Sequence, residues 1–385
     1  MENDPVPSAE EQAFLAHIID DPADDLRRLV FADWLEENGQ GQRATYIRVR
    51  CALDGKRPEF GTYADAIEQL AACRYQVPEV ELPLDFFIRW HQGDRKDWWD
   101  DSEDTMEGGM PSVACVGLEA VAGVTPARHL ASRLQALVET TPIRGLKISD
   151  NLPTYVAALF ASPAASAITR LELRSSHRGG TACPSVVALA ASPMARTLTR
   201  LDLDSSVLNQ ATADTLAAAP FVALRRFDAR HRCKTPEVYR RVMAAPWFGR
   251  LERLVTPVPP GTVGRVALPH LHTLGIWSRA DGPIGALGPS AELPALRRLT
   301  YGGGDLRGDR ATALSALRCG DLVELELRNT GVGPSELRVL LAAPWARRLE
   351  VLTVDEYGPA VLFDEVIDKS PCEKTLRIRR FGDFN

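Results

Sequence analysis

The feature that most constrains the fold is an apolar pattern, LxxLxL, that returns along most of the chain. Full copies begin at Ile143, Ile168, Leu198, Leu271, Leu322 and Leu349, and partial copies lie at Leu224/Phe227, Leu251/Leu254, Leu296/Leu299 and Leu376/Ile378. Successive copies start 20 to 30 residues apart, a spacing typical of stacked repeats. Alternate side chains of a strand point to opposite faces, so the last two apolar residues of each copy face one core. Since one strand cannot bury that face alone, the pattern predicts stacked parallel strands.

A second signal precedes most copies of the pattern. Alanine-rich segments end at Pro193, Pro220, Pro246 and Pro344. Alanine favours helix and proline ends one, so each unit reads as helix, short link and strand. Between residues 257 and 304, proline and glycine crowd the links and indicate irregular turns instead of helices.

Together these signals resemble the leucine-rich repeat (LRR), mostly of the ribonuclease-inhibitor-like class, over residues 113–385. The resemblance implies an α/β fold, an irregular LRR solenoid with a parallel sheet on its concave face and short helices or loops on its convex face. It also implies a way of binding other molecules. It identifies no partner and no chemistry.

The amino-terminal segment is predicted to form two amphipathic helices. Ser8 and Glu11 make a capping box before the apolar face Phe14, Leu15, Ile18 and Ile19. Asp21 and Pro22 are expected to start the second helix, and Gly39 to end it. The spacing assigns the second helix a buried face of Leu26, Leu29, Val30 and Trp34.

This segment resembles the bacterial repeat-companion domain over about residues 8–53. The likeness rests on Glu11–Leu15, Asp20–Pro22, Arg28–Glu36 and Tyr46–Arg48, with the ADWLEE run as its core. The resemblance implies association with repeat arrays and no established activity. Arg28 and Asp33 are interpreted as salt-bridging groups, not a catalytic pair. We therefore divide the chain into a companion domain at 1–53, a helical or loop connector and amino-terminal cap at 54–112, and the solenoid at 113–385.

Composition limits the compartment and the class of partner. The net charge of −6 combines an acidic start, with 11 acidic and 2 basic residues over 1–40, and basic repeats, with 26 acidic and 34 basic residues from 113 onward. Seven cysteines without a CxxC pair predict reduced thiols and a cytoplasmic location. The chain begins without a secretory signal pattern and contains no apolar run long enough for a membrane span.

The candidate site is the face of the strands that points away from the core. Outward positions of successive strands align into rows that carry alternating arginines and acids, with Trp277 in the middle of the array. The candidate binding residues are Arg170, Glu172, Arg174, Arg200, Asp202, Asp204, Arg226, Asp228, Arg230, Trp277, Arg298, Glu326 and Arg328. Such rows form either a neutralising ladder of surface ion pairs or a recognition face, and we favour recognition of a protein or peptide of mixed charge.

Two other classes of function stay open. Arginine rows could bind nucleic acid or another anion, although the acids between them disfavour phosphate. A thiol enzyme would use Cys233 with His231, but neither has a visible catalytic partner. His270, His272, His231 and Cys233 lack the spacing of a metal site, so we predict no cofactor, no metal and no enzymatic activity. The tryptophans at Trp98 and Trp99 either dock a partner or pack on the repeats.

Overall fold

The chain divides into two compact units, residues 1–172 and 173–385. The computed structural model describes residues 8–20, 24–54, 106–107, 110–111, 113–117, 127–140, 143–150, 153–175, 181–205, 208–229, 236–257, 266–277, 291–302, 305–307, 309–320, 322–328, 330–354, 365–367 and 377–380. The predicted connector and cap at 54–112, with Trp98 and Trp99, lies almost entirely outside these residues. The domain boundaries at residues 53 and 112 therefore stay a prediction.

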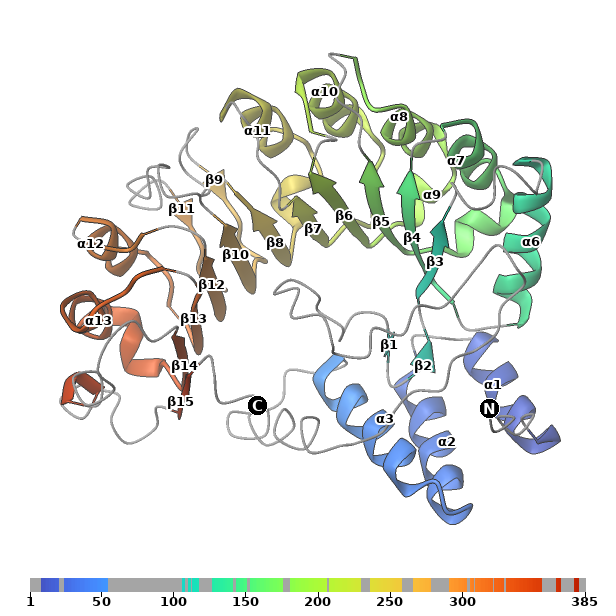
Figure 1. The fold of residues 1–385 in the computed structure, drawn as a ribbon, viewed down its shortest axis with the longest axis horizontal. Coiled ribbons are helices and arrows are strands. Elements are labelled where there is room, and N and C mark those ends of the chain that lie inside the picture. Colours follow the sequence, from blue (N-terminus) through green and yellow to red (C-terminus); the bar gives the residue numbers. More distant parts are fainter. Residues whose placement is uncertain are drawn as a thin grey trace. The chain divides into compact units, whose positions relative to one another are not determined.

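The first unit begins with three helices, α1 (Ala9–Asp20), α2 (Asp25–Glu37) and α3 (Gly41–Asp54) (Figure 1). Ser8 caps α1, since its hydroxyl accepts the amide hydrogen of Glu11 at 3.1 Å. Ile18 is buried and Phe14 and Leu15 pack beside it, so the predicted face of α1 is confirmed at these three residues.

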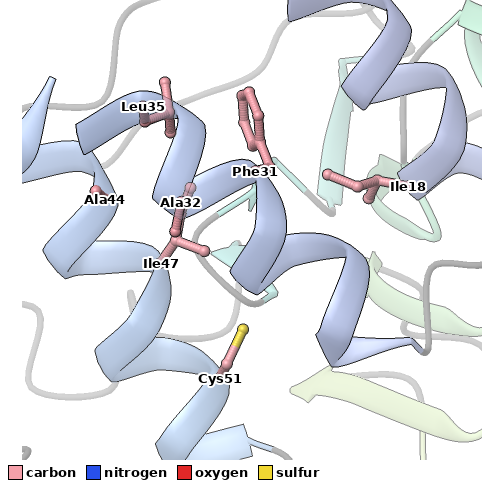
Figure 2. Packing of buried hydrophobic residues seen from close by; sticks show 7 residues of the cluster. All are labelled: Ile18, Phe31, Ala32, Leu35, Ala44, Ile47 and Cys51. Carbon is pink, nitrogen blue, oxygen red and sulfur yellow. The ribbon is translucent and has the colours of Figure 1, made fainter. Parts of the chain in front are cut away.

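The buried face of α2 matches the prediction only in part: Leu29 and Trp34 pack against the core as predicted, but the rest of the face differs. Leu26 and Val30 are 67% and 46% exposed, whereas Phe31, Ala32 and Leu35 are fully buried. These three side chains point into one cluster with Ile18 of α1 and with Ala44, Ile47 and Cys51 of α3 (Figure 2). Both sets of residues have helical spacing, so periodicity alone could not choose between them. The aromatic ring of Phe31 decides the choice, because it lies 5.6 Å from Phe14 and 5.9 Å from Trp34, centroid to centroid.

The start of α2 also differs from the prediction. Asp24 is the N-cap, and its side chain accepts the amide hydrogen of Leu26 at 2.9 Å. Two aspartates stand three residues apart here, and the structure uses the later one instead of Asp21. The predicted end is confirmed, since Gly39 adopts φ +78° just after the helix, a conformation that glycine reaches without steric cost.

The rest of the first unit contains the earliest repeats. Its elements are β1 (Met106–Glu107), β2 (Met110–Pro111), β3 (Val113–Gly117), α6 (Ala127–Thr140), β4 (Gly145–Asp150), α7 (Pro153–Phe160) and η2 (Pro163–Ala167). Strands β3 and β4 pair in parallel, with Val113 opposite Gly145. Strand β5 (Arg170–Ser175) spans the division between the units.

In the second unit, short parallel strands follow one another in chain order. They are β6 (Arg200–Ser205), β7 (Arg226–Ala229), β8 (Arg253–Thr256), β10 (Thr273–Trp277), β12 (Arg298–Gly302), β13 (Glu324–Arg328), β14 (Val351–Val354) and β15 (Arg377–Arg380). The middle apolar residues pair in one register, Leu201 to Phe227 to Leu254 to Leu274 and onward. From Leu201 to Leu352 all of them are buried, so these predicted positions contribute to one continuous core.

Helices cover the outer side of this unit's sheet (Figure 1). They are α8 (Pro184–Ala191), α10 (Gln210–Ala218), α11 (Pro236–Met243), α12 (Asp309–Ser315) and α13 (Pro334–Leu341). The prolines after several helices open a further short turn that leads into the next strand. These turns are α9 (Met194–Thr197), η3 (Phe248–Arg250) and η5 (Pro344–Arg348). The second unit is therefore an α/β leucine-rich repeat solenoid, as predicted.

The irregular middle of the array contains a small sheet that sequence reasoning missed. Strands β9 (Val266–Ala267) and β11 (Ala291–Glu292) pair in parallel with each other. They occupy the links before β10 and β12, where the other described links of this unit carry helices. Leu268 and Leu293, directly after them, are fully buried and extend the core under these links.

Candidate binding face

Strand register in the second unit aligns the predicted residues into three rows. The first row runs Arg200, Arg226, Arg253, Thr273, Arg298 and Glu324 on adjacent strands. The second row runs Asp202, Asp228, Val255, Gly275, Thr300 and Glu326. The third row is described at Trp277, Gly302 and Arg328. We call this surface the inner face. Eight of the predicted residues lie on these aligned strands and are described with their side chains.

The remaining predicted residues belong to the first unit, lie on β5, or have side chains outside the described residues. Arg170 and Glu172 belong to the first unit, where Glu172 forms an ion pair with Lys147 at 3.3 Å. Arg174 is exposed on the last part of β5. The side chain of Asp204 and the whole of Arg230 lie outside the described residues.

Acids of the inner face pair with its own arginines. Arg200 binds Asp202 on the same strand, with Nε and a terminal nitrogen at 2.8 and 2.7 Å from one carboxylate oxygen. Arg298 reaches across to Glu324 on the next strand at 2.6 Å. Glu326 accepts hydrogen bonds from Arg328 at 2.6 Å and from Thr300 at 3.0 Å. The charges are thus held in fixed positions, with much of the arginine charge balanced inside the protein.

Exposure on the inner face is lower than the sequence predicted. We expected exposed ion pairs, but Arg200 is 7% exposed and Asp228 is 5% exposed. Both groups lie on strands that have a paired neighbour on each side, β6 for Arg200 and β7 for Asp228. A buried charged pair responds to mutation far more strongly than a surface pair, because removing one partner leaves the other charge uncompensated. Arg200 therefore has a structural role besides any role in binding.

The centre of the inner face is apolar and built from small residues. The ring of Trp277 lies across the next strand, over Gly302. A Cβ atom at position 302 would come within 2.6 Å of Cη2 of that ring and closer still to Cε3 and Cζ3. Beside it, a Cβ at Gly275 would lie 3.1 Å from a methyl carbon of Val255. Trp277 is half-buried and held flat, where the sequence predicted a fully exposed ring. The glycine that receives the ring was the signal that sequence reasoning passed over.

The charged residues of α2 and α3 form salt bridges, as interpreted from the sequence, although Arg28 itself is buried. Arg28 binds Asp25 at 2.9 Å, and Asp33 binds Arg48 at 2.6 Å. Hydrogen bonds that Arg48 donates to Asp33, and then to Glu36, raise the pKa of Arg48 above its ordinary value. A raised pKa adds stability only below the unfolded-state value, which is already far above neutrality, so Arg48 contributes no pH dependence near pH 7.

Within the described residues, the histidines and cysteines that could act in catalysis or bind a metal do not cluster. No group of three or more His, Cys, Asp or Glu side chains that could hold a metal ion occurs within the described residues. Cys183 is buried, and its amide donates to the Thr212 hydroxyl at 2.9 Å. His270 and His272 precede β10 instead of standing on it. His231 and Cys233, the candidate thiol pair, lie outside the described residues.

Comparisons with known proteins add little to this geometry. No protein-family model matches the chain, and no curated protein matches it significantly. Among solved structures, a Bacteroides fragilis protein is 12% identical, with a TM-score of 0.28 over 68% of this chain and 70% of its own. A Leptospira interrogans LRR protein is 13% identical, with a TM-score of 0.20 over 62% of this chain and 90% of its own. At such scores the LRR assignment rests on the chain's own strand register and buried leucines.

Within the part of the chain that the structure describes, each helix is too short or too polar to cross a bilayer.

Proposed function

We propose that the protein is a binding scaffold and not an enzyme, and that its inner face holds an extended segment of a partner protein. One observation carries this proposal. Three rows of outward side chains run in register across adjacent strands, with charged groups on both sides of the Trp277 ring. An extended peptide laid across parallel strands would meet these side chains one strand after another.

The balance of charge on the inner face supports a partner of mixed charge. Arg200, Arg298 and Arg328 each bind a carboxylate of the same face. A phosphate backbone would therefore meet Asp202, Glu324 and Glu326 together with the arginines. A peptide with both acidic and basic residues can complement both signs, which fixes its register and excludes wrong partners. This favours a protein partner over the alternative of nucleic acid or another anion on this surface.

Trp277 supplies the apolar part of the proposed site. Its ring is already held over Gly302 in the free protein, so little conformational freedom is lost when a partner packs on it. Half-buried aromatic rings surrounded by polar groups are common anchors of protein interfaces. The partner segment should therefore carry an apolar or aromatic residue with charged residues on both sides.

The first unit is proposed to be the repeat-companion domain that its sequence resembles. Three helices packed around Phe31 support this proposal. A thiol enzyme remains the competing proposal for the whole chain. Such an enzyme would depend on Cys233 and His231, whereas peptide binding by the inner face would not. Changing Cys233 to serine should leave peptide binding unchanged.

A peptide library displayed on phage and selected against the full chain tests the proposed function. Selected peptides should contain an apolar residue flanked by charges and bind with measurable fluorescence polarisation. Trp277→Ala should weaken that binding by about 2 kcal/mol or more, about 30-fold. Val339→Ala, at an exposed aliphatic residue of α13, is the matched control and should change nothing. Equal binding by Trp277→Ala and wild type would refute the assignment of the inner face.

A further inference from the structure

A basic surface, separate from the inner face, runs along the edge where the strands of the second unit begin. We define this strand-start edge as the six residues before each of β6, β7, β8, β10, β12, β13 and β14. Every one of these segments contains an arginine or a histidine. In strand order, these basic residues are Arg196, Arg225, Arg250, His270 with His272, Arg297, Arg318, and Arg347 with Arg348.

Backbone hydrogen bonds align these segments. The carbonyl of Arg225 accepts amide hydrogens from Glu252 and Arg253 of the next repeat, at 2.7 and 3.1 Å. The same pair of hydrogen bonds recurs in the next repeats. The carbonyl of Glu252 accepts from the chain at His272, the carbonyl of His272 accepts at Arg297, and the carbonyl of Arg297 accepts at Val323. Strands in the sheet lie about 4.8 Å apart, so six strand intervals span about 29 Å. The segments that carry these basic residues therefore follow one another along the sheet from β6 to β14 (Figure 1).

The charge of this edge is strongly positive at its described positions. By sequence, seven arginines stand against four acids, Glu252, Glu292, Asp321 and Glu350, of which Asp321 lies outside the described residues. Five of the arginines, Arg196, Arg250, Arg318, Arg347 and Arg348, are exposed. The pair of Arg225 with Glu252 is long, at 3.7 Å, and both side chains are over 40% exposed. On the inner face, in contrast, Arg200, Arg298 and Arg328 are closely paired with acids. The strand-start edge thus presents a series of exposed positive charges.

The apolar residues of the edge argue against single-stranded nucleic acid and lipid surfaces as its ligands. Phe221, Trp247, Phe248 and Trp345 are each 2% exposed, so these rings cannot stack on the bases of a single strand. Val222 is the one largely exposed aliphatic side chain among the described residues of the edge, which is too little to insert into a lipid surface. What remains is a line of guanidinium groups, which suits the phosphates of a stiff, linear polyanion.

We propose that the strand-start edge binds the phosphate backbone of double-stranded nucleic acid without reading its sequence. The 29 Å line corresponds to about eight to nine base pairs at roughly 3.4 Å each. The proposal concerns a different surface from the peptide site of the inner face, so either one can fail without the other.

The test measures fluorescence anisotropy of a labelled 20-base-pair DNA duplex, and of the RNA duplex of the same sequence, with the full chain at 50 to 200 mM salt. The edge variant is Arg196→Gln, Arg250→Gln and Arg347→Gln. Loss of three phosphate contacts should lower the slope of log affinity against log salt by about 2.7. Wild-type affinity should then fall about 40-fold more than that of the variant across this salt range.

The matched control removes the same charge from outer helices, through Arg240→Gln, Arg241→Gln and Arg338→Gln, and should keep the wild-type slope. Binding of either duplex with this difference between variants supports the proposal, and the stronger duplex identifies DNA or RNA as the source of the phosphates. Three results overturn it: no duplex binding at 50 mM salt, equal slopes in the edge and control variants, or tighter binding of single-stranded oligothymidine or of phosphatidylserine vesicles than of both duplexes. Trp277→Ala should bind duplex like wild type.

Discussion

The packing of Trp277 on Gly302 allows a sharp test of the inner-face geometry. In Gly302→Ala, the new Cβ would lie within 2.6 Å of the ring, well inside the usual carbon–carbon separation of about 3.5–4.0 Å. The ring must therefore move, and such overpacking costs about 1–3 kcal/mol. Gly302 does not have the positive φ of Gly39 and Gly331, so alanine fits its backbone. Alanine also reduces the conformational freedom of the unfolded chain, which stabilises the folded protein by about 0.4–1 kcal/mol.

The single variant Gly302→Ala should thus lose about 0.5–2 kcal/mol of unfolding free energy. In a Trp277→Ala background the clash is gone, so the same change should become neutral or stabilising by about 0.4–1 kcal/mol. The sign change corresponds to a coupling energy of about 1–3 kcal/mol between the two positions, which is typical of residues in direct contact.

Urea unfolding followed by far-UV circular dichroism measures all four members of this cycle, with the slope m required to stay constant. Gly249→Ala is the matched control, because a Cβ there meets nothing within 4 Å. An equal loss from Gly302→Ala in both backgrounds would show that the ring does not rest on this glycine. The apolar centre assigned to the inner face would then be wrong.

Three further predictions concern packing and charge. Arg200→Glu should destabilise the protein by about 3–5 kcal/mol in urea unfolding, because it places two acids together at a buried position, while Arg226→Glu at a half-buried position should cost less. Thr212→Val should cost about 1–3 kcal/mol, since the buried amide of Cys183 loses its acceptor, whereas Thr215→Val removes only a bond within its own helix and should stay within about 0.5 kcal/mol. Phe31→Ala should cost about 3–5 kcal/mol and speed hydrogen exchange throughout α2, while Leu26→Ala, at a 67% exposed residue, should do neither. Equal losses within any of these three pairs would contradict the burial described above.

Much of the candidate site could be predicted because repeats stack in a fixed register. Arg200, Arg226 and Arg253 occupy equivalent positions of their copies, and the structure places them side by side. The partners of those arginines could not be predicted in the same way. Arg200 binds within its own strand, whereas Arg298 crosses to the next one, and the choice depends on side chains of neighbouring repeats.

The sequence by itself determined the strands that carry the LxxLxL pattern, their order and their core. The leucines of each copy are buried because the period of a strand is local, and a single repeat contains the whole pattern. It also determined the helix cap at Ser8 and the helix end at Gly39, where a few neighbouring residues supply all the contacts. Features of this kind depend on residues close together in the chain.

Only the tertiary structure decided which of several locally equivalent arrangements is used. It turned α2 so that Phe31 is buried and Leu26 exposed, covered Arg200, and laid the Trp277 ring over Gly302. It also formed β9 and β11, which are too short to recognise alone and exist by pairing across 24 residues. In each case the deciding contact comes from another helix or another repeat. A pattern within one segment cannot contain that information, because burial and side-chain orientation are set by what packs against it.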